Sequence, residues 1–153
     1  MYSMLKKKGY PGYLYMIENG ATTTWEHWEG NRSRIHNCYN GIGSWFYQAV
    51  GGIRPLDPGY KRVLIQPQIP DGITWAKTSK ETPYGPLKFN WEIERKEMKM
   101  ELEIPVGTEI EMPLPAKAQE YQLNGKKFEL YGDESPLIKI KSGKYDISYS
   151  LFK

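Results

Sequence analysis

The residues best suited to chemistry gather in one short run, Gly20-Ala-Thr-Thr-Thr-Trp-Glu-His-Trp-Glu29. Its last five residues hold two tryptophans, two glutamates and a histidine. A glutamate can activate a water molecule, and an indole ring can stack on the face of a sugar. The same run also suits an ordinary core, with the tryptophans buried and the glutamates at the surface. The residue types alone therefore leave a sugar-cleaving site and a packed turn as open alternatives.

Both histidines of the chain, His27 and His36, lie in its first third. His36 precedes a predicted helix, where an imidazole can contact a ligand or serve as a hydrogen-bonded structural residue. The second half carries no histidine or cysteine. Its glutamates alternate with apolar residues, which is the pattern of a solvent-facing strand surface. Any catalytic chemistry is therefore expected before residue 54.

A helix should follow the reactive run, because apolar residues recur there at helical spacing. The stripe consists of Ile42, Trp45, Phe46, Ala49 and Val50. Gly51-Gly52 should end this helix, and Pro58-Gly59 suits a turn in a rigid connector. We therefore expect a domain boundary near residue 54.

Beyond the connector, short runs alternate between apolar and polar residues, as strands with one buried face do. The runs cover 62–67, 73–76, 87–93, 98–104, 109–112, 121–123, 128–130, 137–140 and 145–149. Asn124-Gly125 between two runs is a strong hairpin signal. The pattern predicts a mostly β fold, an antiparallel β-sandwich preceded by a short α-helical segment.

Composition narrows the classes of partner. The 153 residues carry 21 basic and 18 acidic side chains, a net charge of +3, which is too balanced to indicate nucleic acid binding. No apolar run approaches a membrane span, and no signal peptide is recognisable, so membrane insertion is not expected. Cys38 is the only cysteine and is expected to be a buried, inert thiol. Without clustered Asp ligands or a phosphate loop, we expect neither a metal nor a cofactor.

Four segments share one resemblance and occur in the same order as in the family concerned. They read GYPGYLYMIENGATTTWE at 9–26, HNCYNGIGSWFY at 36–47, AVGGIRP at 49–55 with PGY at 58–60, and ITWA at 73–76 with PYG at 83–85. Together they resemble the C-terminal part of bacterial α-L-rhamnosidases of glycoside hydrolase family 78. The resemblance implies the C-terminal end of an (α/α)6 catalytic barrel over residues 1–54 and a C-terminal β-sandwich over residues 55–153.

The resemblance also implies a chemistry. This family hydrolyses terminal α-L-rhamnosides with inversion, for which a general acid and a general base stand roughly 6.5–9.5 Å apart across the scissile bond. The resemblance assigns the base to Glu26, a sugar contact to His36 and the pocket wall to Trp25 and Trp28. Glu29 is a further candidate for substrate binding.

The family's general acid lies in an Asp/Glu-rich motif that this sequence does not contain. The resemblance therefore implies the C-terminal portion of an inverting enzyme, inactive alone, whose partner is a rhamnose-containing glycan or glycoside. An alternative of another class is a non-catalytic β-sandwich that binds carbohydrate or serves as a structural cap. An incomplete barrel would expose apolar surface and favour self-association. The parent enzyme would act in the bacterial periplasm, outside the cell or in the cytoplasm.

Overall fold

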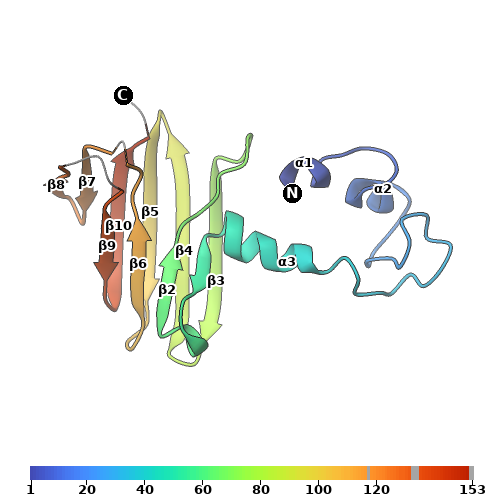
Figure 1. Ribbon diagram of the computed structural model, residues 1–153, viewed down its shortest axis with the longest axis horizontal. Coiled ribbons are helices and arrows are strands. Elements are labelled where there is room, and N and C mark those ends of the chain that lie inside the picture. Colours follow the sequence, from blue (N-terminus) through green and yellow to red (C-terminus); the bar gives the residue numbers. More distant parts are fainter. Residues whose placement is uncertain (117, 132–134, 152–153) are drawn as a thin grey trace. The chain divides into compact units, whose positions relative to one another are not determined.

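The computed structural model describes residues 1–116, 118–131 and 135–151. Its backbone forms two compact units, Met1–Trp45 and Phe46–Lys153 (Figure 1). The two units meet in the chain within the helical stretch that the sequence predicts. The domain boundary near residue 54 concerns which part of the chain folds alone, and it stays a prediction.

The first unit has little regular structure. It contains three short helices, α1 (Tyr2–Leu5), α2 (Tyr13–Glu18) and α3 (Gly41–Trp45), and a long loop between the last two. Met16 and Trp25 are the two buried hydrophobic side chains among residues 1–45, all of which the structure describes. Helices of this length are not stable by propensity alone. The loop must therefore be held by specific contacts.

The second unit opens with a π-helical turn, η1 (Phe46–Val50), in which Ala49 and Val50 are buried. The apolar stripe of the sequence is buried here only in part, because Phe46 is 46% exposed. Trp91 anchors the end of the turn, since its indole Nε1 donates a 2.8 Å hydrogen bond to the carbonyl of Val50. Gly52 then adopts φ +71, and a Cβ there would lie 2.6 Å from the nitrogen of Pro67. Only glycine fits this entry into the first strand.

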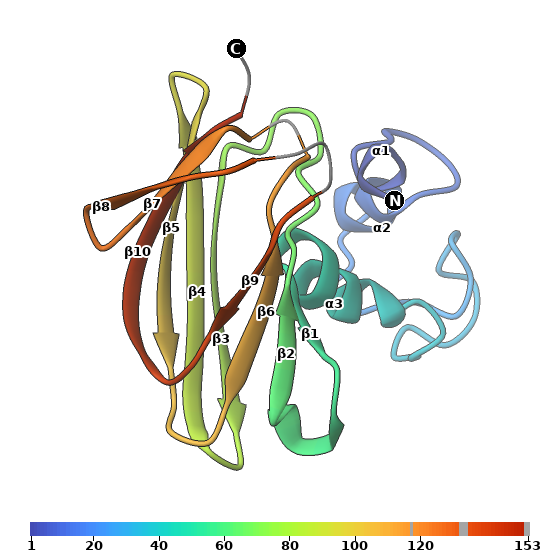
Figure 2. The same cartoon turned by 60° about the vertical axis from the view of Figure 1, so that its left-hand side comes forward.

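Two sheets make up the rest of the second unit, and Figure 2 shows them face to face. The four-stranded sheet has the order β1 (Ile53–Pro55), β2 (Arg62–Ile65), β6 (Glu109–Pro113) and β9 (Leu137–Ile140). The six-stranded sheet has the order β3 (Trp75–Thr82), β4 (Gly85–Glu94), β5 (Glu97–Ile104), β10 (Gly143–Ser150), β7 (Glu120–Leu123) and β8 (Lys126–Glu129). The predicted mostly β fold, an antiparallel sandwich after a short helical segment, is confirmed.

The core lies between the sheets and follows the period-2 pattern of the strands. Phe89 and Trp91 on β4 alternate with exposed or half-buried neighbours, as do Met100 and Leu102 on β5. Val63 and Ile65 face them from β2 and are fully buried. Each of these side chains contributes on the order of 2 kcal/mol of burial free energy. The sandwich therefore has a continuous apolar core of its own.

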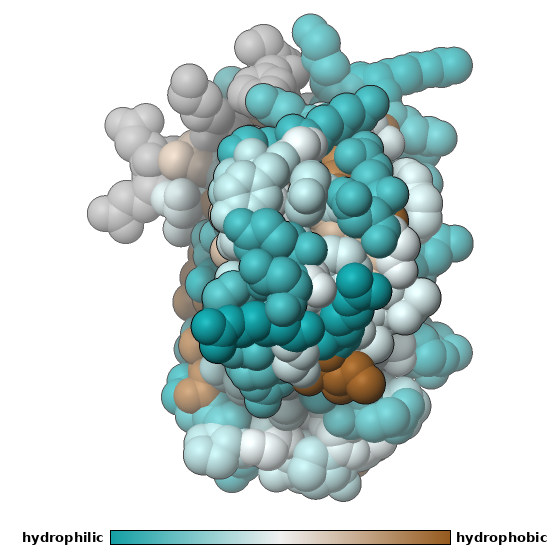
Figure 3. Space-filling model, turned by 90° about the vertical axis from the view of Figure 1, so that its right-hand side faces the viewer, coloured by the Kyte–Doolittle hydropathy of each residue, from teal (hydrophilic) through white to brown (hydrophobic). Residues whose placement is uncertain are grey.

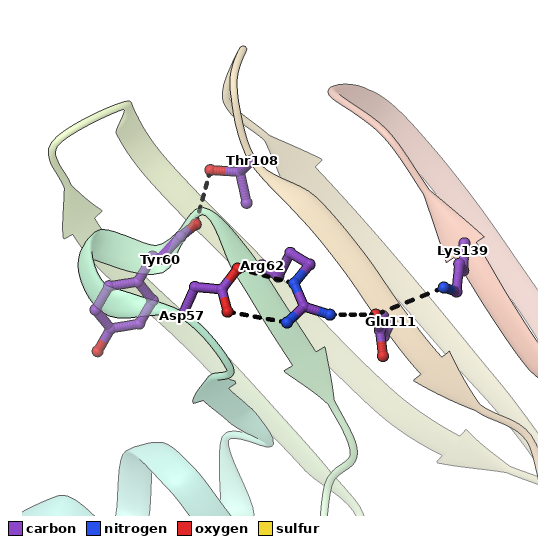
Figure 4. A network of polar contacts seen from close by, with 6 residues as sticks. All are labelled: Asp57, Tyr60, Arg62, Thr108, Glu111 and Lys139. Carbon is purple, nitrogen blue, oxygen red and sulfur yellow. Dashed lines mark hydrogen bonds and ion pairs between the residues drawn. The ribbon is translucent and has the colours of Figure 1, made fainter.

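One strand pair departs from the expected antiparallel pattern. β2 and β6 run parallel, with Val63 opposite Ile110. A polar network lies across this pair (Figure 4). The Arg62 guanidinium donates to both carboxylate oxygens of Asp57 at 2.8 and 2.9 Å, and reaches Glu111 of β6 at 3.3 Å. The bidentate pair connects β2 to the turn η2 (Pro58–Tyr60) that precedes it, and the pKa of Asp57 is lowered by the Arg62 hydrogen bond.

Candidate functional site

The reactive run of the sequence forms one arm of a closed loop in the first unit. The Glu26 N–H donates to the Ser33 carbonyl and the His36 N–H donates to the Thr24 carbonyl, both at 2.9 Å. The hydroxyls of Thr23 and Thr24 donate to the carbonyls of Arg34 and His36, respectively. Residues 23–26 and 33–36 therefore lie side by side, and the pairing brings the glutamate segment and the histidine segment together.

Trp25 forms the buried centre of this loop. Its side chain is 3% exposed, and its ring packs against Gly30, whose φ is +67. On the same ring lies the Arg34 guanidinium, 5.3 Å from the centroid, and Arg34 Nε also donates to the Gly30 carbonyl at 3.1 Å. Within this chain Trp25 therefore organises the loop around Glu26. Its assignment to the sugar-pocket wall stays a prediction.

Glu26 is half-buried, and its backbone and side chain are both tied to Ser33. The Ser33 N–H donates to Glu26 Oε2 at 3.3 Å, opposite the 2.9 Å bond from the Glu26 N–H to the Ser33 carbonyl. The first bond restrains one carboxylate oxygen, and the second holds the Glu26 backbone. A fixed and ionised carboxylate with solvent access is what activation of a water molecule requires. Ser33 had no signal in the sequence, since its role depends only on the loop closure.

His36 lies on the opposite arm of the loop and is exposed. The backbone N–H of Cys38 donates to its Nδ1 at 3.2 Å, so Nδ1 carries no proton in the neutral ring. The proton of the neutral imidazole therefore lies on Nε2. An exposed Nε2–H is a hydrogen-bond donor of the kind that a sugar hydroxyl accepts.

Trp28 belongs to an aromatic cluster with Tyr13 and Tyr39. Its ring stacks on Tyr39 with centroids 4.2 Å apart, and Tyr13 meets it edge-on at 5.4 Å. The Tyr13 hydroxyl donates to the Tyr39 carbonyl at 3.0 Å and so ties α2 to the segment before α3. The cluster leaves Trp28 half-buried. The tyrosines were not singled out by sequence reasoning, although aromatic residues make up 14% of the chain.

Glu29 accepts a hydrogen bond from the Tyr10 hydroxyl, which is the main reason that the pKa of Glu29 lies below its usual range. The same bond raises the pKa of Tyr10. Glu29 is thus an exposed carboxylate engaged by a phenol, and a lowered pKa makes it a weaker base. Its assignment to substrate binding stays a prediction.

The expectation of a buried thiol at Cys38 was wrong, because the side chain is exposed. Its Sγ lies 3.7 Å from the carbonyl oxygens of Trp25 and Glu26. Free cysteines are among the most often buried residues, but residues 31–38 of this chain are all exposed. Cys38 nonetheless contributes through its backbone N–H, which sets the tautomer of His36.

The described residues offer neither a metal cluster nor a membrane-spanning helix. Among the residues that the structure describes, no cluster of three or more His, Cys, Asp or Glu side chains could hold a metal ion. No described helix is long and apolar enough to cross a membrane. The face seen in Figure 3 is mostly hydrophilic or intermediate, with isolated hydrophobic spots. Ile35 is 82% and Ile17 61% exposed, and self-association through such residues stays a prediction.

Comparison with known protein families accounts for both units. The family described as the bacterial alpha-L-rhamnosidase C-terminal domain matches residues 52–129, about half of the chain. The bacterial alpha-L-rhamnosidase 6 hairpin glycosidase domain matches residues 1–50. This chain belongs to the bacterial α-L-rhamnosidase family.

Individual relatives of this rhamnosidase-family chain carry the same name. An alpha-L-rhamnosidase of Formosa agariphila is 34% identical over 99% of this chain and 19% of its own length. An alpha-L-rhamnosidase of Alteromonas sp. (strain LOR) is 33% identical over 76% of this chain and 14% of its own length. The chain thus spans less than a fifth of the length of these relatives.

Solved structures show the same arrangement of elements. The α-L-rhamnosidase from Dictyoglumus thermophilum superposes with a TM-score of 0.86 at 26% identity, over 97% of this chain and 18% of that one. The Streptomyces avermitilis α-L-rhamnosidase complexed with L-rhamnose superposes with a TM-score of 0.83 at 25% identity, over 96% of this chain and 16% of that one. These rhamnosidases therefore share the fold of the chain.

Proposed function

We propose that this chain is the C-terminal portion of an inverting α-L-rhamnosidase and supplies its general base, Glu26. The observation that carries the proposal is the restraint of the Glu26 carboxylate by the Ser33 N–H, in a loop that also holds His36. A general base must be ionised, positioned and reachable by the attacking water. Glu26 is half-buried in a loop closed by backbone hydrogen bonds, which supports that role.

His36 and the aromatic side chains complete the proposed part of the pocket. The Nε2–H of His36 donates to a hydroxyl of the rhamnose unit, because its Nδ1 is already occupied by the Cys38 N–H. Trp28, which stacks on Tyr39, presents the edge of its indole to the sugar. Glu29 accepts a hydrogen bond from a second sugar hydroxyl. The buried ring of Trp25 holds the loop that carries the base.

The base works with a general acid that this sequence does not contain. In an inverting reaction the base takes a proton from water as its oxygen bonds to the anomeric carbon. The acid meanwhile gives its proton to the departing glycosidic oxygen. Without that acid the leaving group departs as an unprotonated alkoxide, so we propose that the 153-residue chain alone has no hydrolase activity.

The decisive experiment places Glu26→Gln in a full-length rhamnosidase of the family that carries this segment in frame. The substitution keeps the shape but removes the base, so kcat on an aryl α-L-rhamnoside should fall by about 10² to 10⁴. Azide should restore part of the turnover by replacing the activated water. Glu18→Gln on α2 is the matched control, since it removes an exposed carboxylate outside the loop, and should keep normal kcat.

Two results would overturn the proposal. Near-normal kcat of the Glu26→Gln enzyme, with a collapse in Glu29→Gln, would move the base to Glu29. Release of the aryl group by the isolated 153-residue chain would show that the acid also lies within residues 1–153.

A further inference from the structure

The outer face of the six-stranded sheet carries two straight rows of side chains that cross the strands. The strand register places Trp75, Glu92, Lys99, Ser148 and Gln122 opposite one another, from β3 across β4, β5 and β10 to β7. These side chains alternate with the buried residues of the same strands, such as Trp91 and Met100. The row therefore lies on the face turned away from the core.

The second row runs beside the first. Lys77, Asn90, Glu101 and Asp146 lie opposite one another on β3, β4, β5 and β10. Asn90 Nδ2 donates to Glu101 Oε2 at 3.0 Å, which fixes the amide orientation. Asn90 Oδ1 and the remaining N–H then stay oriented above the sheet.

A groove of about 680 Å³ lies over the two rows and is lined by residues of both. Its volume is within the range of small-ligand sites. One end is formed by Trp75, whose side chain is 62% exposed. A single exposed indole is ordinary by itself. Trp75 suggests a ligand site because it lies at the end of a polar groove, one strand away from Glu92.

The chemistry of the lining indicates which ligand the groove suits. Neighbouring donors and acceptors such as Lys99 and Glu92 match the adjacent hydroxyls of a sugar, since each hydroxyl both donates and accepts. The indole of Trp75 offers a flat face for the C–H side of a pyranose ring. A second protein is a poorer match, because the centres of protein interfaces are depleted in lysine and glutamate.

The charge and the length of the groove narrow the class of ligand further. Two lysines line the groove against four carboxylates, so the groove repels polyanions such as nucleic acids and uronic acid polymers. The lysines are Lys77 and Lys99, and the carboxylates are those of Glu92, Glu97, Glu101 and Asp146. From β3 to β7 the row crosses four strand spacings, or about 19 Å. A chain of three to four sugar units has a comparable length.

We propose that this groove is a binding site for a neutral oligosaccharide, with Trp75 as the stacking platform and the two polar rows as hydrogen-bonding partners. The site is distinct from the Glu26 loop and does not depend on the function proposed for that loop. A glycan held here would keep the chain attached to a polymeric substrate.

The test is binding of the fluorescently labelled 153-residue chain to an array of neutral and acidic glycans, followed by calorimetry with the best neutral tetrasaccharide. We expect neutral glycans to bind and acidic ones to be rejected. Trp75→Ala should weaken binding by about tenfold or more, while Trp75→Phe keeps a ring face and should retain part of it. The affinity should change less than about twofold between about 0.05 and about 0.5 M NaCl, because a neutral ligand forms no ion pairs.

Tyr131→Ala is the matched control, since Tyr131 is an 87% exposed aromatic residue of the same unit outside the groove. It should bind like the unmodified chain. Absence of binding to every neutral glycan would overturn the proposal. Binding that survives Trp75→Ala but is lost in Trp28→Ala would assign the sugar to the Glu26 loop instead, and a preference for acidic glycans would refute the charge argument.

Discussion

Gly30 lies so close to the Trp25 ring that a Cβ on Gly30 would come within 2.6 Å of ring atoms Cε3 and Cζ3. Gly30 also adopts φ +67, a left-handed conformation that strains other residues. The buried ring and the glycine together set the path of the loop between Glu26 and Ser33. A steric requirement between a glycine and an indole ring thus helps to position the candidate base.

The first prediction is that Gly30→Ala loosens this loop. It should cost about 1–3 kcal/mol, from overpacking together with the strained backbone. Amide hydrogen exchange at residues 26–36 should accelerate. Gly20→Ala is the control, since Gly20 has φ +82 but nothing within 4 Å of an added Cβ, so it carries the backbone strain without the clash. Equal exchange in the two variants would show that the Trp25 contact does not hold the loop.

The second prediction concerns the hydrogen bond from Trp91 Nε1 to the Val50 carbonyl. Trp91→Phe keeps an aromatic ring in the core but leaves that buried carbonyl without its donor. The cost should be about 1–3 kcal/mol, plus a smaller cavity contribution. Chemical denaturation should report the loss, and exchange should rise at residues 46–52. A denaturation midpoint equal to that of the unmodified chain would mean that water replaces the indole.

The third prediction is a loss of stability at high pH through Tyr149. Burial raises the pKa of Tyr149 to about 12 from an ordinary value of 10.0. The folded state therefore binds this proton more tightly than the unfolded chain does. Its contribution is complete below pH 10 and is lost as the pH rises through 12, by about 3 kcal/mol in total.

Denaturation midpoints measured from pH 9 to about pH 12 would test this. Tyr149→Phe should flatten the decline, because phenylalanine has no proton to lose. Tyr47→Phe removes a phenol that is 51% exposed in the same unit, and it should leave the decline unchanged. A Tyr149→Phe profile parallel to that of the unmodified chain would remove Tyr149 from the explanation.

The fourth prediction is that residues 55–153 fold alone and residues 1–35 are the less protected part. The first 45 residues bury only two hydrophobic side chains, and residues 31–38 are all exposed. Open segments of this kind have low local stability. Brief trypsin treatment should cut first at Arg32 and Arg34, leaving the sandwich intact by mass spectrometry. Early cuts within 60–150, with residues 1–35 preserved, would contradict this division.

Much of the fold could be predicted because its signals are local. Alternation over 87–93 and 98–104 predicted β4 and β5, and Asn124-Gly125 predicted the β7–β8 hairpin, where Asn124 has φ 50 and Gly125 has φ 76. The turn between β4 and β5 had no such signal, since Arg95 and Lys96 take positive φ without glycine or asparagine. The parallel pairing of β2 with β6 also had none, because it joins segments far apart in the chain.

For the candidate site, the sequence alone was enough to name the candidate residues, since Glu26 and His36 lie at fixed places within the family motifs. Their burial and contacts could be known only from the folded chain. Trp25 and Trp28 are three residues apart and chemically alike, yet one is buried under Gly30 and the other stacks on Tyr39. Residue types and their periodicity can be recognised from neighbouring positions in the sequence. The burial of Trp25, the tautomer of His36 and the rows of side chains across the sheet depend on residues that only the folded chain brings together.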